Sequence, residues 1–223
     1  MRIGISIDGV LRDLLSKVSD TYDKYFPTEG EDGDVAETPV GDYDFDKWLE
    51  FPEEENDQGE MEFNLDFDKD TFMEDEETIN IIKTSNKVTV EEFLYEKCTL
   101  EVFGYAGEEI TSAVETLNQL ILDKPNIEFV LISREGGLAI PSTMFFLSKT
   151  KSICPNITFV KEYSKVWDHV DMMVTDHPEI IKSCDNRSLV IVDKSYNLDI
   201  VDGKKTLRIK TIKELTELLS EEL

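Results

Sequence analysis

The sequence is poor in basic residues, and this shortage excludes one class of function. It has 23 lysines and arginines against 49 aspartates and glutamates, which gives a net charge of −26. Binding of nucleic acid through its phosphates needs a basic surface, so we expect no nucleic-acid partner. A protein partner with a basic surface fits this charge better.

Cysteine, histidine and long apolar runs are also scarce. The three cysteines lie far apart without metal-binding spacing, and their odd number argues against a disulfide framework. His169 and His177 show no partner pattern, which favours structural roles. No apolar run approaches the roughly 20 residues of a membrane span, and the first residues form a strand pattern instead of a signal peptide. We expect a cytoplasmic protein with no membrane partner.

Acidic residues are concentrated in one part of the chain. Between Glu29 and Glu77, 22 acidic residues stand against two lysines, so this stretch carries −20 of the net charge. Aromatic residues are interleaved with the acids, and chains rich in aromatics can usually bury them. We therefore assign residues 27–89 to an acidic insert with long loops and short elements, and residues 1–26 and 90–223 to the core.

Two stretches of the insert have the acid spacing of a calcium-binding loop. Each has acids at the first, third, fifth and twelfth positions, but the glycine needed at the sixth position is absent from both (Asp42, Asp44, Asp46 and Glu53; Asp66, Asp68, Asp70 and Glu77). The pattern favours a solvated acidic surface over a calcium site.

Outside the insert, short apolar runs alternate with helical patterns. Ile3, Ile5 and Ile7 predict a first strand, and further strands are expected at residues 127–133, 157–161, 170–176, 188–193 and 206–210. Helical spacing follows the first strand as far as Pro27 and recurs from a Thr89 cap to residue 122, then at 141–151 and 212–223. The near-continuous apolar strands are typical of a doubly wound, mostly parallel α/β sheet.

Polar side chains stand at the ends of these strands, where such sheets bind ligands. They follow the first, second and fourth strands, and one lysine precedes the fourth (Ser6, Asp8, Ser133, Lys165, Thr175 and Asp176).

The order of these residues resembles that of the haloacid dehalogenase-like phosphohydrolases, and within them the 5'(3')-deoxyribonucleotidase-like branch. The first motif of that family is an apolar strand followed by Asp-x-Asp-Gly-[Thr/Val]-Leu, and "ISIDGVL" matches it except at the first Asp. "FVLIS" resembles the second motif, and "KVWDHVDMMVTDHPEII" supplies the lysine and the fourth motif. "LVIVDKSYN" resembles a late strand of that branch. The resemblance covers residues 1–25 and 91–223, and the acidic insert falls where the branch places its small cap.

The resemblance implies a phosphohydrolase chemistry that two substitutions put in doubt. It places the nucleophile at Ser6, a general acid/base at Asp8 and the phosphate-binding groups at Ser133 and Lys165. In the family, acids at the positions of Ser6, Thr175 and Asp176 hold Mg²⁺, and only Asp176 is an acid in this sequence. A serine hydroxyl carries no charge and has no obvious base beside it. Loss of a hydrolase nucleophile costs on the order of 10⁶ in rate, so we expect a disabled site in which Asp176 holds Mg²⁺ weakly.

Three functions remain open on the sequence alone. The leading hypothesis is a disabled, nucleotidase-like protein used for binding, with a basic protein partner or a small phosphorylated ligand. The alternative is a divergent Mg²⁺-dependent phosphatase acting on nucleoside monophosphates or another small phosphate ester. The third is a structural component of a larger assembly, and the resemblance extends this to an intracellular viral protein. In a purely structural reading, Asp8 and Gly9 only form a turn and Lys165 lies on the surface.

Overall fold

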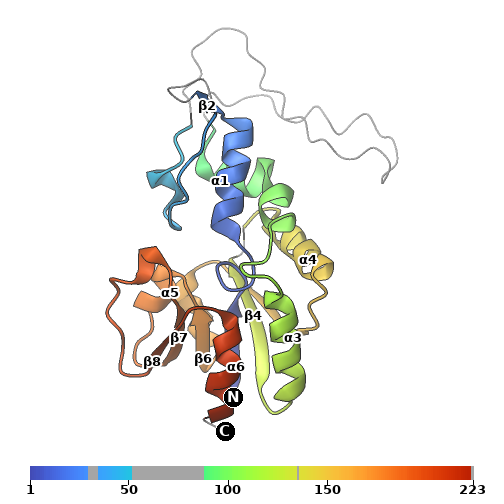
Figure 1. Ribbon diagram of the computed structural model, residues 1–223, viewed down its shortest axis with the longest axis vertical. Coiled ribbons are helices and arrows are strands. Elements are labelled where there is room, and N and C mark those ends of the chain that lie inside the picture. Colours follow the sequence, from blue (N-terminus) through green and yellow to red (C-terminus); the bar gives the residue numbers. More distant parts are fainter. Residues whose placement is uncertain (30–34, 52–87, 135, 222–223) are drawn as a thin grey trace.

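The computed structural model describes residues 1–29, 35–51, 88–134 and 136–221, and its centre is a six-stranded parallel sheet (Figure 1). The strand order is β5-β4-β1-β6-β7-β8. The strands are β1 (Arg2–Ser6), β4 (Glu128–Arg134), β5 (Ile157–Val160), β6 (Met172–Thr175), β7 (Ser188–Val192) and β8 (Thr206–Ile209). The predicted doubly wound α/β sheet is confirmed.

The four central strands of the sheet (β4, β1, β6 and β7) are buried on both faces, which explains why their sequences are nearly continuous apolar runs. Along β4, Phe129 and Leu131 pack into one core cluster, while Val130 and Ile132 pack into another on the opposite face. This alternation follows from the two-residue period of a strand. The first cluster includes side chains of α3 (Ala113–Asp123), α4 (Ala139–Lys149) and α6 (Ile212–Glu221); the second includes those of η5 (Tyr163–Asp168) and α5 (Pro178–Lys182).

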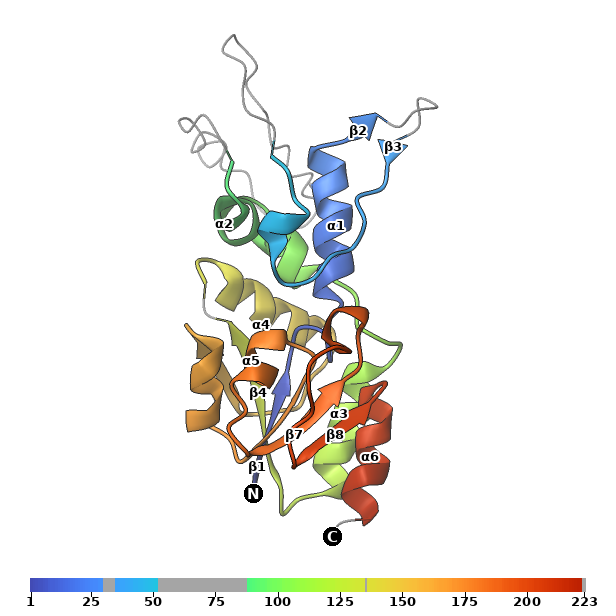
Figure 2. The same cartoon turned by 90° about the vertical axis from the view of Figure 1, so that its left-hand side faces the viewer.

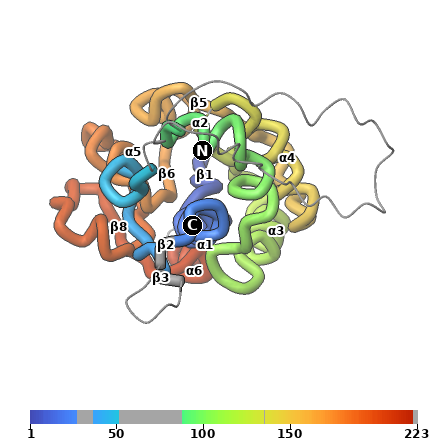
Figure 3. Tube along the Cα trace, turned by 90° about the horizontal axis from the view of Figure 1, so that it is seen from above, coloured from blue at the N-terminus to red at the C-terminus, as the bar shows by residue number. Residues whose placement is uncertain are grey.

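A third core cluster lies above the carboxyl ends of the strands (Figure 2). Its framework is α1 (Leu14–Tyr25) together with α2 (Val90–Glu92) and the π-helical turns η3 (Phe93–Lys97) and η4 (Leu100–Gly104). The short helix η1 (Phe45–Lys47) and the hairpin of β2 (Thr28–Glu29) and β3 (Val35–Ala36) belong to the same end of the molecule. Figure 3 looks down on this end, with α1 near its centre.

The ends of the helices around this third cluster are set by capping residues. The Asp13 carboxylate accepts a hydrogen bond from the Ser16 N–H at 3.2 Å and so caps α1. Thr89 caps α2 as predicted, and Glu92 completes a reciprocal capping box. The predicted continuous helical pattern after Val90 divides into short turns, and the regular helix begins only at Ala113.

Several predictions extend beyond the described residues. Residues 52–87, which include Glu53 and the second calcium-like stretch, lie outside them. In the first stretch, the Asp42 carboxylate accepts the Asp44 N–H at 2.8 Å, and Asp44 pairs with Lys47. The proposed domain boundaries stay a prediction, since α1 packs with residues of the insert in the third cluster. In the part of the chain that the structure describes, no helix is both long and apolar enough to cross a membrane.

Candidate functional site at the strand ends

The sheet topology brings most of the predicted site residues to one edge. Strand β1 lies between β4 and β6, so the chain order reverses beside it, and ligands of such sheets bind where the order reverses. Ser6 pairs in register with Ile132, the residue before Ser133, and β6 ends beside β1 at Thr175. These side chains are nearly or fully buried, at 0 to 5% exposed.

The side chains of Ser6 and Thr175 are hydrogen-bonded to each other. The Ser6 hydroxyl donates to the Thr175 Oγ1 at 2.8 Å, and that oxygen also accepts the His177 N–H at 3.1 Å. Among the described residues, no acid or imidazole is hydrogen-bonded to Ser6. A serine needs an adjacent base to act as a nucleophile. The hydrogen bond between Ser6 and Thr175 therefore links two strand ends and does not activate Ser6.

A tight turn after β1 folds Arg12 back onto Asp8. The N–H groups of Leu11 and Arg12 both donate to the Ile7 carbonyl, at 3.0 and 2.8 Å, and the Gly9 N–H donates to the Arg12 carbonyl. The Arg12 Nε then donates to the Asp8 Oδ1 at 2.7 Å, and its Nη2 approaches the same oxygen at 2.6 Å. Arg12 is 0% exposed and Asp8 is 6% exposed, so this is a buried ion pair.

The surroundings of Arg12 hold its side chain in place. Its Nη1 donates to the Phe103 carbonyl at 2.6 Å and to the Thr143 hydroxyl at 3.0 Å. The guanidinium also lies over the rings of Phe103 and Phe146, at 5.1 and 5.3 Å from their centroids. The second Asp8 oxygen accepts the Ser133 hydroxyl at 3.4 Å. Both oxygens of Asp8 therefore have partners within the protein.

Asp176 lies under a pair of tyrosines. The Tyr43 hydroxyl donates to its Oδ2 at 3.0 Å, the Tyr196 hydroxyl donates to the same oxygen, and Asn197 donates to its carbonyl at 2.9 Å. Asp176 is 0% exposed, and burial raises its pKa to about 7 in spite of these donors. Gly9 must stay small here, because its φ is +70° and a Cβ would lie 1.8 Å from the Asp176 Oδ2.

The His177 ring contacts two tyrosine rings, each tilted against it. Its ring lies 4.1 Å from that of Tyr43 and 3.9 Å from that of Tyr163. Its Nδ1 accepts the Glu179 N–H at 3.2 Å and so caps α5. Burial, and then the positive charge of Arg134, lowers the pKa of His177 to about 3, so the ring is neutral near pH 7.

Lys165 does not join this cluster in the described residues. It lies in η5 with its side chain exposed, and no hydrogen bond or ion pair connects it to Asp8 or Ser133. Its role in phosphate binding stays a prediction. The buried cation at this edge is Arg12, which the sequence analysis missed; an arginine four residues after Asp8, within a turn, was the available signal.

The described arrangement does not fit the magnesium site that the resemblance implies. Magnesium prefers oxygen ligands that include carboxylates, whereas Ser6 and Thr175 are hydrogen-bonded to each other. The Asp8 carboxylate is paired with Arg12, and the Asp176 carboxylate accepts two tyrosine hydroxyls. Within the described residues, no group of three or more His, Cys, Asp or Glu side chains is placed to hold a metal ion.

No protein-family model and no curated protein matches this sequence. The resemblance to the haloacid dehalogenase-like family thus rests on the motifs alone, whereas the doubly wound sheet and the buried strand-end side chains (Ser6, Asp8, Ser133, Thr175 and Asp176) are features of the structure itself.

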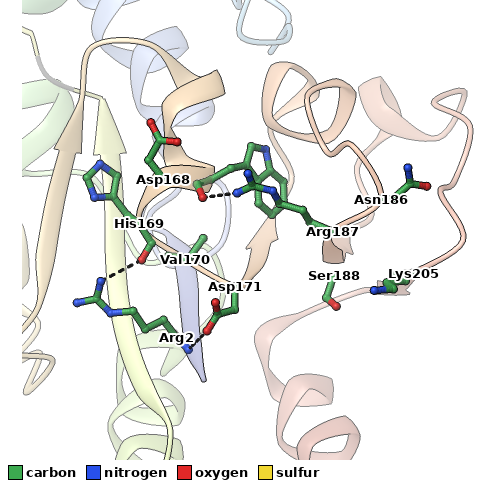
Figure 4. Close-up of a pocket in the computed structure, with 10 residues that line it drawn as sticks. Arg2, Asp168, His169, Val170, Asp171, Asn186, Arg187, Ser188 and Lys205 are labelled. Atoms are coloured by element: carbon green, nitrogen blue, oxygen red, sulfur yellow. Dashed lines mark hydrogen bonds between the residues drawn. The ribbon is translucent and has the colours of Figure 1, made fainter.

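A separate cavity of about 460 Å³ opens at the opposite edge, beside the amino ends of β1, β6, β7 and β8 (Figure 4). The Arg187 guanidinium donates to the Trp167 carbonyl there and lies over the Trp167 ring. The Arg2 N–H donates to the Asp171 carboxylate at 2.8 Å. None of the strand-end residues Ser6, Asp8, Ser133, Thr175 and Asp176 lines this cavity.

Proposed function

We propose that this chain is a catalytically disabled, nucleotidase-like protein of the haloacid dehalogenase-like fold, whose strand-end site serves binding. The main support is the Ser6–Thr175 hydrogen bond of 2.8 Å. It joins the two positions where the resemblance requires carboxylates, so neither an attacking carboxylate nor its partner acid is present. The position of Asp8 also supports a disabled site. A general acid must reach the leaving group, whereas Asp8 is paired with the buried Arg12.

The acidic insert suggests the kind of protein partner. Residues 29–77 carry most of the net charge of −26, and a partner with a basic surface would be attracted to them. A small phosphorylated ligand is less well supported at the strand ends, since the buried cation Arg12 is already paired with Asp8.

The competing proposal is a divergent phosphatase, and one observation favours it. Asp8, Ser133 and Asp176, three of the groups that the family uses, lie at the same edge, with Ser133 bonded to Asp8 at 3.4 Å.

Hydrolysis decides between the two proposals. Nucleoside monophosphates and an aryl phosphate are incubated with the protein and Mg²⁺, against an EDTA control. We expect no turnover above that control. Metal-dependent turnover that Asp8→Asn abolishes, measured below the unfolding temperature of that variant, would establish the phosphatase.

A double variant tests the reason for the loss. Ser6→Asp with Thr175→Asp puts two carboxylates where the hydroxyls lie 2.8 Å apart. Like charges this close repel and raise one pKa, so we expect the metal-free variant to unfold at a lower temperature than wild type. Mg²⁺ should reverse that loss, while the single Ser6→Asp variant should respond less. If Mg²⁺ did not change the unfolding temperature of the double variant, the site would lack more than these two acids.

A further inference from the structure

The strand-end site is covered by a segment of the insert that is fixed at both ends to α1. We call residues 38–51 the covering segment. At its start, the Thr38 N–H donates to the Asp23 carboxylate at 3.0 Å, and the Ser19 hydroxyl donates to the Thr38 carbonyl at 2.6 Å. At its end, the Tyr22 hydroxyl donates to the Glu50 carbonyl, and Leu49 is buried.

A compact turn in the middle of the covering segment aims Tyr43 at the site. The Trp48 Nε1 donates to the Asp42 carbonyl at 2.9 Å, and the Asp44 N–H donates to the Asp42 carboxylate at 2.8 Å. The Trp48 ring packs against Gly41, where a Cβ would lie 2.3 Å from it. The turn is therefore stabilised by contacts within the covering segment, and the Tyr43 side chain extends from it toward the strand ends.

Tyr43 contacts the site as a separate ligand would. Its hydroxyl donates to the buried Asp176 carboxylate, and its ring lies against His177 and edge-on to Tyr196, at a centroid distance of 5.9 Å. Contact between aromatic rings combined with one directed donor is a usual way that a small aromatic molecule is held. The carboxylate selects for a hydrogen-bond donor on the ring and disfavours a second anion.

We propose that Tyr43 is an internal ligand of the strand-end site, and that this site accepts a planar ring bearing a hydroxyl donor once Tyr43 is removed. The proposal rests on the binding role proposed above and names its ligand class. Phosphate plays no part in it, so the hydrolysis assay tests whether the site is catalytically disabled, and the titration below tests the ligand class.

The test vacates the site and refills it. Tyr43→Ala removes the phenol, and 4-methylphenol, which is the tyrosine side chain as a free molecule, is titrated against the thermal unfolding of the variant. We expect a saturable rise in melting temperature of a few degrees, because a ligand that binds the folded state alone stabilises it. Toluene, which lacks the hydroxyl, and phenyl phosphate should each give a smaller rise.

Phe45→Ala is the matched control, because Phe45 lies in the same segment and packs on Tyr43 and Trp48 without bonding Asp176. An equal response of Phe45→Ala and Tyr43→Ala to 4-methylphenol would overturn the proposal, as would no saturable response of Tyr43→Ala.

Tyr43→Phe supplies an independent measurement if Tyr43→Ala does not fold. It keeps the ring and removes the donor, so amide exchange across residues 38–51 should accelerate several-fold over wild type. Tyr105→Phe, at an exposed tyrosine outside the site, should leave that exchange unchanged. Equal exchange in Tyr43→Phe and wild type would mean that the hydroxyl does not hold the covering segment, and the proposal would fail.

Discussion

Replacing Asp8 with asparagine keeps the shape of the side chain and removes the charge that faces the Arg12 guanidinium. Arg12 is 0% exposed and would keep its bonds to the Phe103 carbonyl and the Thr143 hydroxyl. Breaking a buried ion pair by removing one partner costs about 3–5 kcal/mol, because an uncompensated charge stays buried. Domains have about 5–15 kcal/mol of stability in total, so we expect Asp8→Asn to lose a large fraction of it.

The assay is urea denaturation followed by circular dichroism, on wild type, Asp8→Asn, Arg12→Met and the double variant. Methionine retains much of the apolar stem of arginine without its charge. The double variant buries no unpaired charge, so its loss should be smaller than the sum of the two single losses by about 2 kcal/mol or more. Asp20→Asn, at an exposed acid of α1, should stay within about 0.5 kcal/mol of wild type.

A loss below about 1 kcal/mol in Asp8→Asn, additive with that of Arg12→Met, would refute this reasoning. It would mean that the ion pair is dispensable and that Asp8 is free for chemistry. The expected coupling, in contrast, would give Asp8 a structural role, which the proposed loss of catalysis at this site requires.

Three further predictions concern the neighbouring residues. Asp176 keeps its proton up to a pKa of about 7 in the folded state, against 3.8 ordinarily, so its contribution to stability falls as pH rises from about 4 to about 7. Asp176→Asn should therefore remove this fall, so that the unfolding free energy increases more with pH than that of wild type in this window, and an unchanged slope would contradict it. The lowered pKa of His177, about 3 against 6.5, acts in the opposite direction, with stability lost as pH falls below about 6.5. His177→Gln should remove that loss and make the fall due to Asp176 steeper, which the same denaturation series measures. Gly9→Ala should cost more than about 2 kcal/mol, since φ is +70° and the added carbon meets Asp176; Gly107→Ala, where a Cβ has nothing within 4 Å, is the control, and equal losses in the two variants would refute the steric argument.

Much of the sheet could be predicted from local patterns. Its four central strands are buried on both faces, so each appears as a short apolar run, and the run from Ile127 predicts β4 to within one residue at each end. The helices around the third cluster were harder, because the helical pattern after Val90 is continuous in sequence while the chain breaks into π-helical turns at Phe93 and Leu100. The turn that begins at Leu100 packs against α1 and α4, and the periodicity of the sequence does not record such long-range contacts.

The residues of the candidate site could likewise be predicted only in part. Ser6, Ser133 and Thr175 could be placed together because parallel strands end at one edge. Tyr43 could not, since its contact with Asp176 spans 133 positions and depends on a turn within an acidic stretch that has no periodicity. Arg12 was missed for a different reason: a charged residue one turn after a strand is ordinarily solvated, and its burial depends on Phe103 and Thr143, far along the chain.

The tethering of the covering segment at both ends also sets how any free molecule competes for the site. A group held on a short tether has an effective concentration in the millimolar range or above at its own target. A dissolved ring with the chemistry of Tyr43 must exceed that concentration to displace it. A partner that draws the covering segment away from Ser19 and Tyr22 would remove this competition. Binding at the insert and binding at the strand ends would then be linked, and by reciprocity each would strengthen the other.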